Sequence, residues 1–188
     1  MNISRVILSK LNDYLLLIHK WNQIYNLTAI RELSTMMQLH VCDSLAIQQF
    51  IHGTRILDVG SGAGLPGIPL AIANPHLEVV LVDSNGKKTR FLSEVKRKLE
   101  LSNVTIVQTR IEKYLSDANF DTIICRAFSD IKTFLELTHH CLKPCGIWLA
   151  MKGIIPHVEL SSIQQAYTIY PYTLPAFQGL RCCIVIAN

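Results

Sequence analysis

The sequence predicts an α/β protein with a mostly parallel sheet, helices on both faces of that sheet, and additional N-terminal helices. From Arg55 onward, short β-rich runs alternate with longer runs whose apolar residues have helical spacing. A glycine-rich turn joins the first β-rich run to the helix that follows it. Residues 1–52 show only helical spacing, so we expect one domain over residues 1–188, with a helical cap at 1–52 and an α/β core at 53–188.

Composition supports a single compact domain. The chain has 188 residues, of which 49% are hydrophobic and 17% are charged, as is typical of a globular protein and not of a disordered one. The net charge of +4 permits a polyanionic partner without requiring one. No run approaches the ~20 apolar residues of a membrane span. The N-terminal residues carry charges, unlike a signal peptide, so we expect a cytoplasmic protein with no membrane contact.

The cysteines do not indicate a metal site. All six are present without a paired CxxC cluster, so we expect reduced and mostly buried thiols and no bound metal.

The N-terminal part is expected to form two helical stretches. In the first, from Ile3 to Trp21, the apolar positions with helical spacing are Ile7, Leu11, Tyr14, Ile18 and Trp21. A polar loop, YNLTAIRE, follows. Ser34 is a suitable N-cap for the second stretch, MMQLHVCDSLAIQQF, which ends before Gly53.

The remaining residues are expected to supply the sheet and its covering helices. The predicted strands are RILDV (55–59), EVVLVD (78–83), VTIVQT (104–109), DTIICRA (121–127) and GIWLAMK (146–152). The predicted helices between them are 66–74, 87–101 and 131–142. The apolar run LRCCIVIAN (180–188) is expected to add a strand at one edge of the sheet.

The glycine turn has the features of a nucleotide-binding loop. Gly60, Gly62 and Gly64 follow the first strand, and Pro66 stands where the next helix begins. Glycine allows a sharp turn and close approach to a ligand, while a helix N-terminus offers unpaired N–H groups to an anion. Asp83 ends the second strand, where a carboxylate can accept hydrogen bonds from both ribose hydroxyls.

Two cofactor classes fit such a loop. Gly62, Gly64 and Gly67 satisfy the G-x-G-x-x-G pattern of dinucleotide enzymes. However, Asp58 lies inside the first strand, which dinucleotide folds usually keep apolar, and the chain is too short for the separate substrate domain of most dehydrogenases. These features favour S-adenosylmethionine over NAD(P).

Several motifs together give a closer resemblance. They are WNQIYNLTAIRE, HVCDS, ILDVGSGAGLPGIPLAI, LVDSNGKKTRFL, QTRIEKY, CRAF and AMKG, in that order along nearly the whole chain. In these motifs the chain resembles the bacterial 16S rRNA N7-guanine methyltransferases, the RsmG family, also called glucose-inhibited division protein B or GidB. The unbroken GLPGIP run is the most specific of them.

The resemblance implies a Rossmann-like class I S-adenosylmethionine-dependent methyltransferase fold and a single methyltransferase domain. It implies methyl transfer to N7 of a guanine in the 530-loop region of 16S rRNA, the family target guanine-527, in the small ribosomal subunit. By resemblance the cofactor would lie along the loop made of Gly60, Gly62, Gly64 and Leu65. Asp83 would face its ribose, Ile111 and Glu112 its adenine, and Arg126 would stand beside the site.

The implied reaction needs no general base. Guanine N7 has a free lone pair, so the protein contributes chiefly by positioning the reactants, which can lower a barrier by about 7–11 kcal/mol. Asn26 in YNLT is a candidate for holding the base, since an amide can donate and accept at a purine edge, or it only caps a turn. His40 and Asp43 share a helix face. They could form an acid–base pair, form a hydrogen-bonded pair or contact RNA.

Basic residues mark a possible RNA surface. Arg110, Arg126 and Lys152 fall at or near the carboxyl ends of predicted strands, where open α/β sheets bind ligands. We expect them to hold the RNA backbone or the cofactor carboxylate. Lys88 lies in a basic helix that either contacts RNA or is a solvated face. The expected RNA-binding residues are therefore His40, Lys88, Arg110 and Lys152.

Three other readings stay open. An S-adenosylmethionine-dependent methyltransferase of another substrate has the same cofactor loop. An NAD(P)-dependent oxidoreductase would need a hydride-handling arrangement, and no Y-x-x-x-K appears. A non-catalytic RNA-binding module could keep the fold. We expect a monomer that acts on 16S rRNA, either free or in the small subunit.

Overall fold

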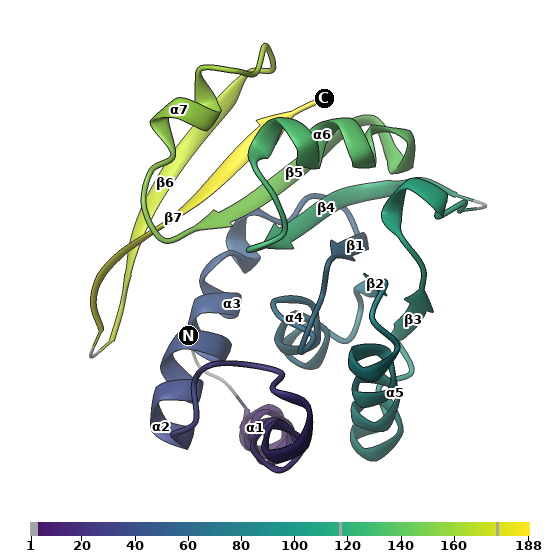
Figure 1. Cartoon of the computed structure of the whole chain (residues 1–188), viewed down its shortest axis with the longest axis vertical. Coiled ribbons are helices and arrows are strands. Elements are labelled where there is room, and N and C mark those ends of the chain that lie inside the picture. Colours follow the sequence, from purple (N-terminus) through teal and green to yellow (C-terminus); the bar gives the residue numbers. More distant parts are fainter. Residues whose placement is uncertain (1–3, 117, 176) are drawn as a thin grey trace.

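The computed structural model describes residues 4–116, 118–175 and 177–188 and contains a seven-stranded sheet with the order β3-β2-β1-β4-β5-β7-β6 (Figure 1). The first five strands run parallel, while β7 is antiparallel to both β5 and β6. The strands are β1 (Arg55–Val59), β2 (Glu78–Asp83), β3 (Val104–Gln108), β4 (Phe120–Arg126), β5 (Leu142–Lys152), β6 (Tyr167–Leu174) and β7 (Phe177–Ala187). The predicted α/β class is confirmed.

Helices cover both faces of the sheet (Figure 1). α1 (Arg5–Tyr25), α4 (Gly67–Ala73) and α5 (Gly86–Leu99) lie on one face, and α6 (Ile131–Thr138) lies on the other. Successive residues of β1 alternate between two apolar cores: Ile56 belongs to the first, with α1, α4 and α5, and Leu57 to the second, with α6. Both faces are therefore buried, as expected of parallel strands.

The C-terminal strands differ from the prediction. The apolar run at 180–188 does form a strand, but β7 lies between β5 and β6 and not at the edge. The edge strand is β6, which the sequence analysis missed. Most of its side chains are exposed or half-exposed and it contains Pro171, so it lacks the apolar pattern of a buried strand. The short helix α7 (His157–Leu160) was also missed.

The N-terminal helices agree with the prediction in number and differ at their ends. Ile3, the predicted start of the first, lies outside the described residues, and α1 continues past Trp21 to Tyr25. The second stretch begins at Leu33, because Glu32 and not Ser34 caps it: the Glu32 carboxylate accepts from the N–H groups of Ser34 and Thr35. Its segments are α2 (Leu33–Met36), a π-helical turn η1 (Met37–Cys42), α3 (Asp43–Ala46) and η2 (Gln48–Phe50).

Two further short 3-10 turns complete the chain. η3 (Ile111–Lys113) follows β3, and η4 (His139–Cys141) joins α6 to β5. η3 begins three residues after the carboxyl end of β3.

One buried hydrogen bond joins the N-terminal cap to the core. The side chain of Tyr14, on α1, is fully buried, and its hydroxyl donates to the carbonyl oxygen of Ala63 at 2.7 Å. Ala63 lies in the glycine turn between β1 and α4. Burial raises the pKa of Tyr14 well above its ordinary value, so the phenol stays protonated and remains a donor. The first helix therefore supports the glycine turn directly.

Replacing Tyr14 with Phe should destabilise the protein by about 1–3 kcal/mol, because the buried Ala63 carbonyl loses its donor while the ring still fills its space. Urea unfolding measures the change. Tyr170→Phe is the matched control, since that ring is 40% exposed and stacks on Phe50 with or without its hydroxyl. Equal stability of the two variants would show that the Tyr14 hydroxyl contributes nothing.

Candidate functional site

The turn between β1 and α4 has a backbone that favours glycine. Gly60, Gly62 and Gly64 have φ angles of 67°, 59° and 89°, in the left-handed region that residues with a Cβ atom avoid. The N–H of Gly60 donates to the carbonyl oxygen of Val82 at 2.9 Å, which ties the turn to β2. As predicted, α4 begins immediately after Pro66.

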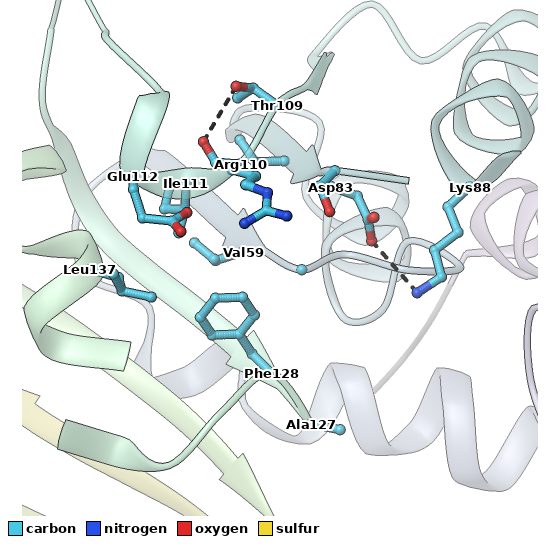
Figure 2. A pocket seen from close by; sticks show the side chains of 13 residues that line it. Val59, Asp83, Lys88, Thr109, Arg110, Ile111, Glu112, Ala127, Phe128 and Leu137 are labelled. Carbon is cyan, nitrogen blue, oxygen red and sulfur yellow. Dashed lines mark hydrogen bonds and ion pairs between the residues drawn. The ribbon is translucent and has the colours of Figure 1, made fainter. Parts of the chain in front are cut away.

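A cavity of about 360 Å³ opens at the carboxyl ends of β1 and β2 (Figure 2). It is enclosed by the ends of these strands and by the segments after β3 and β4. The lining residues are Val59, Gly60, Val82, Asp83, Ser84, Lys88, Thr109, Arg110, Ile111, Glu112, Ala127, Phe128 and Leu137. Open α/β sheets bind ligands at this edge.

The carboxylate of Asp83 is the main polar group on one side of the cavity. Its carboxylate accepts from the N–H of Gly62 at 2.9 Å and from the N–H of Asn85 at 2.8 Å. The ammonium of Lys88 lies 3.9 Å away, at the rim. A carboxylate has about four acceptor positions, so Asp83 can still accept from a ligand hydroxyl.

The other side of the cavity is largely apolar. The ring of Phe128 lies against Gly60, so closely that a Cβ atom there would stand 2.6 Å from the ring. Ile111 and Leu137 complete this surface. Figure 2 shows Arg110 pointing into the cavity between Asp83 and Glu112. The site therefore combines an acceptor for hydroxyl groups with an apolar surface for a flat ring, which is what a nucleoside requires.

A second carboxylate lies beneath the glycine turn. Asp58 is fully buried; one oxygen accepts from the N–H of Gly67 at 2.9 Å, while Oδ1 has no hydrogen-bond partner among the described residues. Burial raises its pKa to about 7. An unpaired buried acceptor is unusual in a native protein, and it suits a site whose ligand carries a positive group.

Arg126 ends β4 but does not line the nucleoside cavity. Its Nη1 donates to the carbonyl oxygen of Leu39 at 2.9 Å and lies 3.3 Å from the carboxylate of Asp43. Its Nη2 lies 3.5 Å from Nδ1 of His40. Arg126 is thus directed at the second helical stretch, and the CRAF and HVCDS motifs meet at this guanidinium.

The surroundings of His40 do not suit the RNA contact predicted for it. Only 4% of this residue is exposed, and its Nε2 lies 3.0 Å from the hydroxyl of Thr28, in the YNLT segment. Burial, with a smaller effect of Arg126, lowers the pKa of His40 to about 4. A neutral, buried imidazole is a weak base at neutral pH and is shielded from a macromolecular partner. His40 and Asp43 both face Arg126 across the interior.

Asn26 occupies the C-cap of α1 in a left-handed conformation, with φ of 48°. Its side-chain oxygen accepts from Arg31 at 3.4 Å. This geometry matches the alternative that Asn26 caps a turn. It is not among the residues that line the nucleoside cavity.

Some of the remaining predicted residues line the cavity and others do not. Gly60, Asp83, Ile111, Glu112, Arg110 and Lys88 all line the cavity, whereas Gly62 lies beside it and Gly64 and Leu65 are buried behind it. Lys152 ends β5, where its ammonium donates to the Ser129 carbonyl at 3.1 Å and to the Glu159 carboxylate at 2.8 Å. Arg110, which was predicted to bind RNA, therefore lies at the cavity. Lys152, predicted to do the same, is bound to other groups of the protein.

Several residues of these sites were not among the predicted ones. Phe128 and Ala127 belong to the CRAF motif, but nothing in the sequence indicated that the ring turns back onto Gly60. Tyr14 carried only the signal of a core residue. Tyr172 and Arg181, which contact Asp43, come from strands whose pairing was not predicted.

The described residues contain no group of three or more His, Cys, Asp or Glu side chains arranged to hold a metal ion. All six cysteines are free, and Cys125, Cys141, Cys182 and Cys183 are buried. Among the helices in the described part of the chain, none has the length and apolar character to cross a membrane.

Comparison with known proteins gives a consistent result. The GidB family model, described as rRNA small subunit methyltransferase G, matches residues 7–180. Ribosomal RNA small subunit methyltransferase G of Legionella pneumophila (strain Philadelphia 1) is 53% identical over 176 residues, which cover 94% of this chain and 85% of that protein. The protein of the same name from Nitrosospira multiformis is 46% identical over 188 residues, covering 95% and 87%.

Solved structures support the fold. A SAM dependent methyltransferase from Aquifex aeolicus superimposes with a TM-score of 0.64 at 19% identity, over 82% of this chain and 93% of that one. Precorrin-6y C5,15-methyltransferase from Geobacter metallireducens gives 0.60 at 12% identity, over 86% and 90%. The fold of this chain is thus shared with these two proteins.

Replacing His40 with Gln should reduce the loss of stability in mild acid. The folded pKa of about 4 lies below the ordinary value of 6.5, so the unfolded chain binds a proton first, and the free energy of unfolding falls as the pH drops from about 6.5 to about 4. We expect this part of the loss, on the order of 1–3 kcal/mol, to be absent in the variant. Urea unfolding from pH 4 to pH 7.5 measures it.

Asp58 acts in the opposite direction over the same pH range, because its raised pKa lets the folded state hold a proton that the unfolded chain has lost. Both proteins contain Asp58, so the difference between their stability curves isolates His40. Parallel curves would contradict the buried, neutral state of His40.

Proposed function

Since the chain belongs to the rRNA small subunit methyltransferase G family, we propose that it transfers a methyl group from S-adenosylmethionine to N7 of a guanine in 16S rRNA. The guanine that we propose is the family target, guanine-527 of the 530-loop region. The observation that carries the proposal is the cavity formed by the glycine turn and Asp83, in a chain that matches this family over residues 7–180.

The cavity fits the nucleoside half of S-adenosylmethionine, which when bound supplies a methyl group made electrophilic by its sulfonium. Asp83 would accept from the ribose hydroxyls, while Ile111 and Glu112 would lie against the adenine. Gly60 has no side chain, which leaves room for the Phe128 ring that forms the apolar side of the cavity. Gly62, Gly64 and Leu65 contribute through the backbone that they shape. The unpaired oxygen of Asp58 suits the positive half of the same molecule.

The sequence predicts that Arg110 holds the RNA backbone or the cofactor carboxylate. Because it points into the cavity between Asp83 and Glu112, we propose that it packs against the bound nucleoside instead of an RNA phosphate. Its planar guanidinium can stack on an aromatic ring.

The protein's part in the methyl-transfer step is positioning. Guanine N7 attacks with its own lone pair, so no side chain has to remove a proton, and the low pKa of His40 is compatible with that chemistry. Arg126, at the end of β4, would hold an anionic group of the RNA or the cofactor. Asn26 lies at the C-terminal end of α1 and would have to contact the guanine from there. Its observed contact, with Arg31, is explained by its place at the cap of the helix.

RNA would be held by the basic face of α5 and the rim of the cavity. The helix carries Lys87, Lys88, Arg90, Lys96, Arg97 and Lys98. Arg97 is paired with Glu94, and Lys88, whose side chain is 38% exposed, lies 3.9 Å from the Asp83 carboxylate. Lys152 would have to break its ion pair with Glu159 before it could contact RNA, so we propose it only as a secondary RNA contact.

We propose that residues 1–188 act as one methyltransferase domain and as a cytoplasmic monomer, with residues 1–52 as its helical cap. The contacts of α1 with α4 and α5 support a single unit. A small domain offers little surface for selecting one guanine, which favours the small ribosomal subunit as the substrate.

The proposed function can be tested with labelled S-adenosylmethionine and small ribosomal subunits from cells that lack the modification. Label at N7 of guanine-527, mapped by primer extension or mass spectrometry, is the expected result. Free 16S rRNA in a parallel reaction tells whether the assembled subunit is required. Binding of the cofactor without label in either RNA would contradict the RNA assignment and leave a methyltransferase of another substrate.

Asp83→Asn should weaken S-adenosylmethionine binding about 5- to 150-fold, because an amide replaces two charged acceptors at the ribose and the Gly62 N–H. Calorimetry measures the affinity. Asp121→Asn is the matched control, since that carboxylate holds Lys143 and the N–H groups of Thr54 and Arg55 at the amino ends of the strands. Equal affinities in both variants would remove Asp83 from the cofactor site.

Lys88→Gln should weaken RNA binding and reduce the slope of log affinity against log salt by about one, the amount expected for one lost phosphate contact. Filter binding to small subunits at several salt concentrations measures the slope. Lys132→Gln on α6 removes a more exposed lysine, also near a carboxylate, from the other face of the sheet and should leave the slope unchanged. A change of equal size in both variants would point to general charge and not to a contact.

A further inference from the structure

A buried carboxylate connects three parts of the chain near the end of β4. The side chain of Asp43, in α3, is only 3% exposed. It lies 3.3 Å from Nη1 of Arg126, accepts from the hydroxyl of Tyr172 at 2.8 Å, and lies 3.9 Å from Nε of Arg181. These partners belong to β4, β6 and β7, so a single carboxylate joins the helical cap to the central sheet and to its antiparallel edge.

The position of Asp43 depends on an irregular helix. The π-helical turn η1 ends at Cys42, directly before Asp43, and an inserted π-turn rotates the residues that follow it about the helix axis. The carbonyl of Leu39, within this turn, accepts from the same guanidinium nitrogen of Arg126. The turn and the carboxylate therefore hold the same nitrogen of Arg126.

Arg126 is held by contacts to both of its terminal nitrogens and is partly exposed. Its side chain is 22% exposed although its Nη1 is engaged by Leu39 and Asp43. A guanidinium has five N–H donors in a fixed plane, so contacts that hold Nη1 help to orient the remaining donors. Two arginines face one aspartate here, and the low pKa of His40 keeps that residue neutral, so the cluster retains a positive charge for an anionic ligand.

We propose that Asp43 is a positioning residue for methyl transfer, which acts by fixing the guanidinium of Arg126 at the carboxyl end of β4. This inference rests on the proposed function, since it takes Arg126 to touch the RNA or the cofactor. Tyr172 supports Asp43 from the edge of the sheet through its hydrogen bond.

The test compares steady-state methylation of small subunits by the wild-type protein and by Asp43→Asn, which preserves size and an acceptor for Tyr172 but removes the charge. We expect kcat to fall about tenfold or more, with a smaller change in KM, because the loss falls on orientation in the transition state. Asp43→Glu should recover part of the rate. Asp121→Asn removes a carboxylate from an ion pair far from the carboxyl edge and should keep wild-type kcat.

A double-mutant cycle separates positioning from structural support. If Asp43 acts through Arg126, Asp43→Asn should add almost no further loss of kcat in an Arg126→Lys background. Additive losses, or a lower melting temperature with unchanged kcat, would overturn the inference. If Asp43→Asn fails to fold, Tyr172→Phe takes its place in the same cycle, with a smaller expected loss.

The activity of the wild-type protein distinguishes a failure of the proposed function from a failure of the role proposed for Asp43. A wild-type protein that leaves the guanine unmethylated contradicts the proposed function itself. A wild-type protein that methylates it, together with an Asp43→Asn variant of equal kcat, contradicts only the role of Asp43.

Discussion

The hydrogen bond from the Gly62 N–H to the Asp83 carboxylate is the contact on which the site depends. It joins the turn after β1 to the end of β2, and the neighbouring bond from Gly60 to Val82 holds the same two segments. Both contacts require a turn whose glycines adopt left-handed angles. Tyr14 supports the turn from behind through Ala63. The shape of the cavity therefore follows from backbone geometry, and the side chains that line it complete a site already formed.

The helical cap contributes to the carboxyl edge of the sheet as well as to the core. Thr28 contacts His40, while Arg126 contacts Leu39 and Asp43, so the YNLT, HVCDS and CRAF motifs are parts of one buried polar cluster. Buried charges persist where they are paired and hydrogen-bonded. Their appearance together in the sequence is thus explained by contact in space, although they are far apart along the chain.

Much of the fold could be predicted because its signals are local. The strand RILDV is apolar and directly followed by the glycine turn, and β1 has the predicted bounds. Edge strand β6 escaped prediction because exposed side chains and Pro171 hide its pattern, and the place of β7 depends on a partner that local patterns do not identify. The same limit applies to the site. Asp83 could be predicted from its strand end, whereas the burial of His40 and the direction of Arg126 depend on long-range packing.

The place of β7 between β5 and β6 also makes the C-terminal strands part of the buried polar cluster. In the described part of the sheet, β7 pairs with β5 and β6 pairs with β7, so the position of β6 depends on that of β7. Tyr172 and Arg181, on these two strands, both contact Asp43. A truncation that removed β7 would therefore deprive this buried carboxylate of two of its partners, which is more than the loss of an edge strand.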